Sequence, residues 1–135
     1  MLTLTKDMET GVPKIDEQHK ELIHRINAVL EIGSKSASHE ETQKTINFLN
    51  EYIIKHFGEE EALQRQYKYP QYEQHREQHK FFIAEFKKLK EEFSANGPSP
   101  KFAVGINKTI ISWITKHIKT VDVVFGQYYK EQAKR

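Results

Sequence analysis

Apolar residues recur every three or four positions in four separate segments of this 135-residue chain, and this spacing restricts the fold more than any other feature. Steps of three and four residues keep side chains on one face of an α-helix, whereas strands need a strict alternation that the sequence lacks. The recurring positions are Ile15, His19, Leu22, Ile26 and Val29; Ile46, Leu49, Ile53, His56, Glu60 and Leu63; Tyr72, His75, His79, Phe82, Phe86, Leu89 and Phe93; and Phe102, Ile106, Ile110, Trp113 and His117. The pattern predicts four amphipathic helices around one core.

Residues that start and end helices lie between these segments. They are Pro13, Gly33 with the polar residues that follow it, the capping box of Ser38 and Glu41, Pro70, Gly97, and Ser99 with Pro100. We expect a fourth helix over about 101–118, and a short extra helix or a bent continuation over 119–134. The predicted fold is therefore all-α: an up-down-up-down four-helix bundle with an N-terminal arm over 1–12 and a short C-terminal helix, forming one domain over 1–135.

Composition argues against several classes of protein. The 21 basic and 19 acidic residues give a net charge of +2 without a basic stripe, so we expect no nucleic-acid partner. The chain has no cysteine, which excludes disulfides and thiolate metal sites. No signal peptide or run of 18 apolar residues is present, so we expect a cytoplasmic protein with no membrane segment. Because the apolar positions can be satisfied within one bundle, we expect a monomer, although Tyr128 and Tyr129, expected to be exposed, leave an interface open.

Polar residues occupy buried positions in all four expected helices. They are His19, His56, Glu60, His75, His79 and His117. Burying one polar group without a partner costs about 1–3 kcal/mol. Six such groups approach the net stability of a small domain, about 5–15 kcal/mol. The sequence therefore predicts a compensating partner, and a bound metal ion would provide one.

A simpler interpretation exists for each residue taken alone. A single buried histidine is usually a hydrogen-bonded core residue, and the pair His75 and His79 could belong to a histidine-rich surface. In the acidic run 59–61 only Glu60 lies at a buried position, so its two neighbours are expected to face solvent. We expect His24 and His39 to take no part in the site.

Asp122 follows His117 by five residues, which is a weak signal on its own. Five residues of a straight α-helix turn the side chain about 140° away. The two groups can meet only if the helix bends or ends between them, and the β-branched residues Thr120 and Val121 mildly favour a bend.

These residues resemble the pattern of the hemerythrin family, in its bacterial, single-domain kind. The matching motifs are "IDEQH" (His19), "HFGEE" (His56, Glu60), "HREQH" (His75, His79) and "HIKTVD" (His117, Asp122), in the family's order and spacing. The resemblance extends from Gly11 to about Tyr128. It departs from the family at Leu4, where bacterial relatives often have tryptophan, and at Gln64, near a position where many have methionine.

The resemblance implies two non-haem iron ions joined by an oxo or hydroxo bridge, with O2 as the ligand. Its seven metal ligands would be His19, His56, Glu60, His75, His79, His117 and Asp122. If both carboxylates bridge, the last three histidines complete six ligands at one iron, and the first two leave one open position at the other. Relatives line the O2 pocket at the positions of Leu22, Phe57, Trp113, Ile114 and Ile118. Mixed imidazole and carboxylate ligands suit iron, whereas calcium and magnesium prefer oxygen alone and zinc prefers four ligands.

The expected function is reversible O2 binding for transport, storage or delivery, and the protein is not expected to be an enzyme. Alternatives on the same scaffold stay open: sensing of O2, nitric oxide or redox state, a di-iron peroxidase or nitric-oxide-reducing activity, and iron storage. Ferritin-like di-iron oxidases use E-x-x-H motifs on two helices, and none occurs at the buried positions here.

Overall fold

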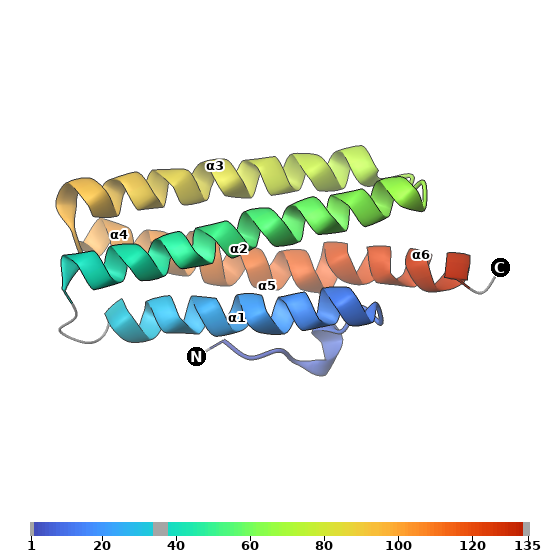
Figure 1. Ribbon diagram of the computed structural model, residues 1–135, viewed down its shortest axis with the longest axis horizontal. Helices are drawn as coiled ribbons and strands as arrows, with labels where there is room; N and C mark the ends of the chain where they lie inside the picture. The colour runs from blue at the N-terminus through green and yellow to red at the C-terminus, as the bar shows by residue number, and fades with distance from the viewer. Residues whose placement is uncertain (1, 34–37, 134–135) are drawn as a thin grey trace.

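The chain folds as a bundle of antiparallel helices (Figure 1). The computed structural model describes residues 2–33 and 38–133, and within these ranges it contains helices and no strand. The first three long helices are α1 (Pro13–Gly33), α2 (His39–Gln66) and α3 (Tyr72–Asn96). The chain is then helical from Pro100 to Ala133, as α4 (Pro100–Gly105), η2 (Ile106–Ser112), α5 (Trp113–His117), η3 (Ile118–Asp122) and α6 (Val123–Ala133). The all-α bundle predicted from the sequence is confirmed.

The helix ends follow the capping residues of the sequence closely. Ser38 accepts a hydrogen bond from the backbone nitrogen of Glu41 at 3.0 Å and so caps α2. Ser99 accepts one from the backbone nitrogen of Phe102 at 3.1 Å. Gly97 ends α3 with a φ of 65°, a conformation that favours glycine. Most of the expected loop between α1 and α2 lies outside the described residues.

One expected boundary was misplaced. The sequence suggested that Pro70 starts the third helix, but α3 begins at Tyr72 and Pro70 lies in the turn before it. The turn is held at Tyr69, whose backbone nitrogen donates to the carbonyl of Gln64 at 2.9 Å. Proline cannot supply that donor, so it occupies the next position of the turn.

The last helical stretch neither bends sharply nor ends near residue 118. Its segments η2 and η3 are π-helical, so the chain passes from α5 into α6 without leaving the helix. The part beyond η3 carries the chain past the turn between α2 and α3 (Figure 1). The predicted C-terminal helix is therefore present as α6, and it continues directly from η3.

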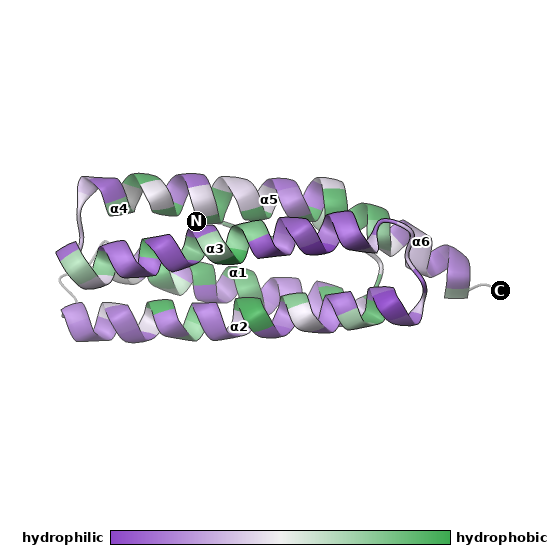
Figure 2. Ribbon diagram, turned by 90° about the horizontal axis from the view of Figure 1, so that it is seen from above, coloured by the Kyte–Doolittle hydropathy of each residue, from purple (hydrophilic) through white to green (hydrophobic). Residues whose placement is uncertain are grey.

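Hydrophobic and hydrophilic residues alternate along the helices (Figure 2), and most of the large apolar side chains are buried. They form two clusters. The large cluster includes Leu22, Ile26, Leu49, Ile53, Phe57, Phe82, Phe86, Phe93, Ile110, Ile114 and Ile118. The small cluster consists of Val12, Ile15, Tyr69 and Phe125, with Leu63, Tyr72, Tyr128 and Tyr129 packed against it.

The two clusters are separated by a layer of polar residues. In α1, His19 lies between Ile15 of the small cluster and Leu22 of the large one. Along η3 and α6, Asp122 lies between Ile118 of the large cluster and Phe125 of the small one. The same alternation holds in α2 and α3. The bundle therefore closes off its polar layer from both ends.

The N-terminal arm lies along the bundle and contributes to the core. It contains one turn, η1 (Lys6–Met8), and Met8 is buried in the large cluster. Leu4, at a position where bacterial members of the resembling family often have tryptophan, is half-buried against the same cluster. The backbone of Leu2 exchanges two hydrogen bonds with the side chain of Asn27, at 3.0 and 2.8 Å.

The expectation that Tyr128 and Tyr129 are exposed was wrong. Both are half-buried against the turn between α2 and α3. The hydroxyl of Tyr128 donates to the carbonyl of Tyr67 at 2.6 Å, and the ring of Tyr129 lies 4.9 Å from that of Tyr67.

Among the helices of the described ranges, none is both long and apolar enough to cross a membrane.

Candidate metal centre

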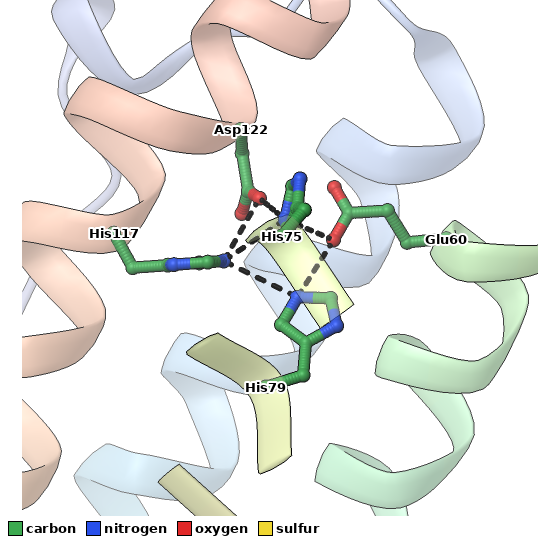
Figure 3. A group of neighbouring side chains, drawn as sticks. All are labelled: Glu60, His75, His79, His117 and Asp122. Atoms are coloured by element: carbon green, nitrogen blue, oxygen red, sulfur yellow. Dashed lines mark hydrogen bonds and ion pairs between the residues drawn. The ribbon is translucent and has the colours of Figure 1, made fainter. Parts of the chain in front are cut away.

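The buried polar layer brings together all seven residues that the sequence suggested as metal ligands. Their metal-ligating atoms form two groups: Glu60, His75, His79, His117 and Asp122 in one, and His19, His56 and Asp122 in the other. We call these the five-donor group, drawn in Figure 3, and the three-donor group. Every member is at most 3% exposed. Residues from α1, α2, α3 and the consecutive segments α5 and η3 thus converge in one buried layer.

In the five-donor group, three imidazole rings point their Nε2 atoms at one place. Nε2 of His117 lies 3.1 Å from Nε2 of His75 and 3.2 Å from Nε2 of His79. Oδ1 of Asp122 lies 2.9 Å from Nε2 of His75 and 3.1 Å from Nε2 of His117. Oε1 of Glu60 lies 3.3 and 3.2 Å from Nε2 of His75 and His79.

These separations suit a cation with six ligands. Two ligands at right angles around one ion, with bonds of about 2.1 Å, lie about 3.0 Å apart, whereas a tetrahedral angle separates them by about 3.4 Å. The six observed separations run from 2.9 to 3.3 Å, and the three shortest, 2.9–3.1 Å, are nearer to the first value. Three ring nitrogens this close cannot all find separate hydrogen-bond acceptors, so a shared cation fits the group.

The three-donor group shares Asp122 with its neighbour. Oδ2 of Asp122 lies 3.0 Å from Nε2 of His19, while Oδ1 faces the other group. The rings of His19 and His56 meet edge to face with centroids 4.8 Å apart. Nε2 of His56 and Oε2 of Glu60 are buried and have no hydrogen-bond partner among the described residues. Buried polar atoms are rarely left unpaired, and a cation shared by these donors would satisfy them.

The π-helical turn η3 explains how Asp122 reaches the site. A π-helix closes its hydrogen bonds over five residues, so residues five apart return to the same face. His117 immediately precedes η3 and Asp122 is its last residue, and both side chains enter the five-donor group. The hydroxyl of Thr120 donates to the carbonyl of Lys116 at 2.7 Å, at the start of this wide turn. The expected bend or helix end is thus replaced by a wider helix.

Four further side chains contact the Nδ1 atoms of ligand histidines, a role not predicted from the sequence. They are Gln18, Glu61, Gln64 and Gln78. Nδ1 of His56 donates to Oε1 of Gln18 at 2.8 Å, and Nδ1 of His117 donates to Oε1 of Gln78 at 3.0 Å. Each of these glutamines directly precedes a histidine of the site, in the repeated sequence "EQH". Each "EQH" therefore supplies one donor histidine and one amide that orients the histidine of a neighbouring helix. The repetition was a usable signal.

Glu61 was expected to face solvent, but it lies against the site. Its Oε2 lies 2.8 Å from Nδ1 of His79, and its side chain is only 16% exposed. The prediction failed because the recurring apolar positions mark only one face of α2. Glu61 lies beside that face, and its side chain reaches across to His79 on α3. Carboxylates that accept from a ligand histidine fix the ring and strengthen it as a donor.

Gln64 is fully buried beside His75, four residues after Glu60 on the same face of α2. Its amide nitrogen lies 2.7 Å from Nδ1 of His75, and its amide oxygen has no partner in the described ranges. A cation at Nε2 of His75 leaves the ring hydrogen on Nδ1, which needs an acceptor. Turning the amide of Gln64 over would supply its oxygen there.

The electrostatics of the layer keep both carboxylates ionised. Burial and the nearby Asp122 would raise the pKa of Glu60, but hydrogen bonds from His75 and His79 lower it to about 2. Burial would likewise raise the pKa of Asp122, but the surrounding histidines hold it well below its ordinary value. Burial would lower the pKa of His75, yet the two carboxylates raise it to about 10. Protons on the rings thus balance the carboxylates, and a metal cation would displace them.

His56 and His117 differ from His75 because burial lowers the pKa of both rings below the ordinary value. Burial lowers the pKa of His56 to about 4, so its ring is neutral near pH 7. A neutral imidazole with a free Nε2 is the form that binds a metal.

The five residues expected to line the O2 pocket lie in or against the large cluster. Phe57 stacks on the ring of His79 with centroids 3.8 Å apart, and Trp113 stacks on His117 at 4.4 Å. Both rings therefore contact the five-donor group. Leu22, Ile114 and Ile118 are each 1% exposed. His24 is exposed and His39 stacks on Phe93, so neither joins either group of donors.

Comparisons with known proteins agree with this arrangement. The chain is 28% identical over 116 residues to the bacteriohemerythrin of Pseudomonas paraeruginosa, covering 86% of this chain and 73% of the relative. It is 28% identical over 108 residues to the myohemerythrin of Sipunculus nudus, covering 80% and 77%. A crystal structure of a wild-type hemerythrin has the same fold, with a TM-score of 0.83 at 23% identity over 94% of this chain and 96% of the other. The family model described as the hemerythrin HHE cation binding domain matches residues 10–128, and the chain therefore belongs to the hemerythrin family.

Proposed function

We propose that the protein binds O2 reversibly at a di-iron centre formed by the five-donor and three-donor groups. The observation that supports this most is the position of Asp122, whose two carboxylate oxygens face different groups. A carboxylate placed in this way can hold two cations close together. The family to which the chain belongs binds non-haem iron and O2.

The unequal numbers of histidines in the two groups suit a ligand-binding site. Three imidazoles belong to the five-donor group and two to the three-donor group. If Glu60 also bridges through its unpartnered Oε2, one iron has one protein ligand fewer than the other. Two ferrous ions held in this way would supply electrons and an open position for O2.

The residues around the layer would protect such a centre from water. Phe57 and Trp113 cover the rings of His79 and His117, and Ile118 is buried beside them. The small cluster covers the opposite side of the layer. Excluding water stabilises charge interactions inside the site and limits side reactions. A dry site favours a reversible carrier over an oxidase, so we propose that any peroxidase activity is minor.

The visible spectrum of iron-loaded, anaerobically reduced protein tests the proposal. The spectrum is recorded before air, after air, and after purging with inert gas, with iron content measured in parallel. Colour that appears with O2 and fades on purging is the expected result. Colour that decays to a stable diferric spectrum, unaffected by purging, would reject reversible binding and favour the sensing or enzymatic alternatives. Failure to retain iron would reject the centre itself.

A further inference from the structure

The four side chains that hold the histidine Nδ1 atoms are not equivalent. Gln18, Gln64 and Gln78 offer neutral amides to His56, His75 and His117. Only His79, among the rings whose Nδ1 contact the structure gives, faces a carboxylate, that of Glu61 at 2.8 Å. The five-donor group thus contains one histidine with an anionic partner and two with neutral ones.

We propose that Glu61, acting through His79, sets the reduction potential of the metal centre. This inference rests on the proposed iron site and goes beyond it, because neither the ligand set nor the family match assigns a role to Glu61. It makes Glu61 a positioning residue, since it contacts a ligand and not the metal.

The physical reason is the charge on the hydrogen-bond acceptor. A carboxylate attracts the Nδ1 hydrogen more strongly than an amide oxygen does, and this increases electron density at Nε2. A more electron-rich Nε2 stabilises the ferric ion more than the ferrous ion. The reduction potential of the iron bound by His79 is therefore lower than it would be with a neutral partner.

The surroundings of His79 allow this effect to reach the centre. The ring is stacked on Phe57 with an angle of 2° between planes, which fixes its orientation. Its Nε2 lies 3.2 Å from both Glu60 and His117 within the five-donor group. The side chain of Glu61 is 16% exposed, so water screens its charge only in part.

The chain offers a variant that should act in the opposite direction. Gln78 is exposed, and its Oε1 already accepts from Nδ1 of His117. Gln78→Glu would therefore give a second histidine of the same group a carboxylate partner without burying a charge. Glu61→Gln keeps the size of the side chain at the other ring while removing the charge.

Glu59 provides a matched control. It lies two residues from Glu61 in the same acidic run and is 33% exposed. Its contacts are with Lys14 at 3.3 Å and the amide of Gln18 at 2.9 Å, not with a ring. Glu59→Gln removes the same charge from the same helix at a residue that contacts no ring directly, and its amide oxygen can still accept from Gln18.

The experiment measures iron content and then the midpoint reduction potential of wild type, E61Q, Q78E, the double variant and E59Q. Full iron content is expected throughout. In E61Q the preference of the site for ferric over ferrous ion should fall about tenfold. This corresponds to a rise in the reduction potential of about 59 mV for a one-electron couple. Q78E should lower the potential, the double variant should return near wild type, and E59Q should shift it much less than E61Q.

Each other result counts against the inference. An unchanged potential in iron-replete E61Q would overturn it and leave the proposed function standing. An equal shift in E59Q would overturn it too, because charge alone would then suffice. If E61Q fails to retain iron, Q78E decides: a lowered potential supports the inference and an unchanged one overturns it. A wild-type protein that binds no iron would overturn both proposals.

Discussion

The polar layer and the large apolar cluster are buried to the same degree but are stabilised in different ways. His79 in the layer and Phe82 in the cluster are both 0% exposed, although they lie three residues apart on α3. Burying an apolar side chain such as that of Phe82 contributes about 1.5–3 kcal/mol. A buried polar atom without a partner, such as Nε2 of His56, instead costs about 1–3 kcal/mol.

This difference suggests that the two regions of the bundle depend on a bound metal to different degrees. The large cluster holds the helices together whether or not a metal is bound. The polar layer holds ionised carboxylates between opposed histidines, and it reaches its full stability only with a cation in place. Mutations in the two regions should therefore differ in how their effects depend on iron.

The largest effects are expected from removing a ligand. His117→Ala or Glu60→Ala should abolish the di-iron centre, because the remaining donors would be buried without a common cation. Removing one partner of a buried charge pair typically costs about 3–5 kcal/mol, so the iron-loaded protein should also lose stability. Iron content and the unfolding midpoint measure both effects. Unchanged values in both variants would refute the ligand assignment.

A core mutation far from the layer should behave in the opposite way. Phe93 is 1% exposed and lies 14 residues, or about 21 Å of helix, beyond His79 on α3. Phe93→Ala should cost about 3–5 kcal/mol through the cavity it leaves. Chemical denaturation should show this cost with and without iron, while iron content stays unchanged. Loss of iron would mean that the two regions are not independent.

The comparison also shows which parts of the site were accessible from the sequence. His75 and His79 are four residues apart on a regular α-helix, so their shared face follows directly from the helical period. His56 and Glu60 follow the same rule, and the fold follows from the same spacing. The position of Asp122 does not follow from the helical period. It depends on the π-helical turn η3, which has no comparable pattern in the sequence.

The partners of the histidine rings were harder to predict for another reason. Gln18 contacts a ring on α2, and Glu61 a ring on α3, so each contact depends on how two helices face one another. A periodic pattern within one helix carries no information about that. Two signals in the sequence did point to ring partners. Gln64 continues the buried face four positions after Glu60, and the repeated "EQH" marks Gln18 and Gln78 beside ligand histidines.

A smaller effect is expected from the boundary between the two regions. Ile118 belongs to the large cluster but lies next to His117 in the chain, and Ile118→Ala should cost about 2–5 kcal/mol. Because it also opens the apolar cover of the layer, we expect faster autoxidation of the oxygenated protein. Ile110→Ala is the matched control, since Ile110 is equally buried two turns away. Decay of the oxygenated spectrum should speed up only in the first variant. Equal rates in both would mean that Ile118 does not shield the site.

The smallest effect on folding is expected from Gln18→Ala. This substitution tests how much the orientation of the ligand His56 depends on a hydrogen bond rather than on packing. Gln18→Ala removes the acceptor for Nδ1 of His56 and should cost the iron-free protein only about 1 kcal/mol. Loss of such a partner typically weakens metal binding about 10–100-fold. Since His56 belongs to the three-donor group, we expect one of the two irons to be lost first. Competition with a chelator would then remove iron in two steps in the variant.

Gln43→Ala provides the comparison for Gln18→Ala, because Gln43 also has hydrogen-bonded partners, Asn47 and Ser94, but none in the polar layer. It should change stability by a similar small amount and leave the chelation curve as in wild type. Two-step loss in Gln18→Ala alone would show that a single hydrogen bond at the edge of the layer controls the weaker of the two positions. Identical curves in both variants would mean that packing against His19 suffices to orient His56, and the layer would then depend less on its amide partners than its geometry suggests.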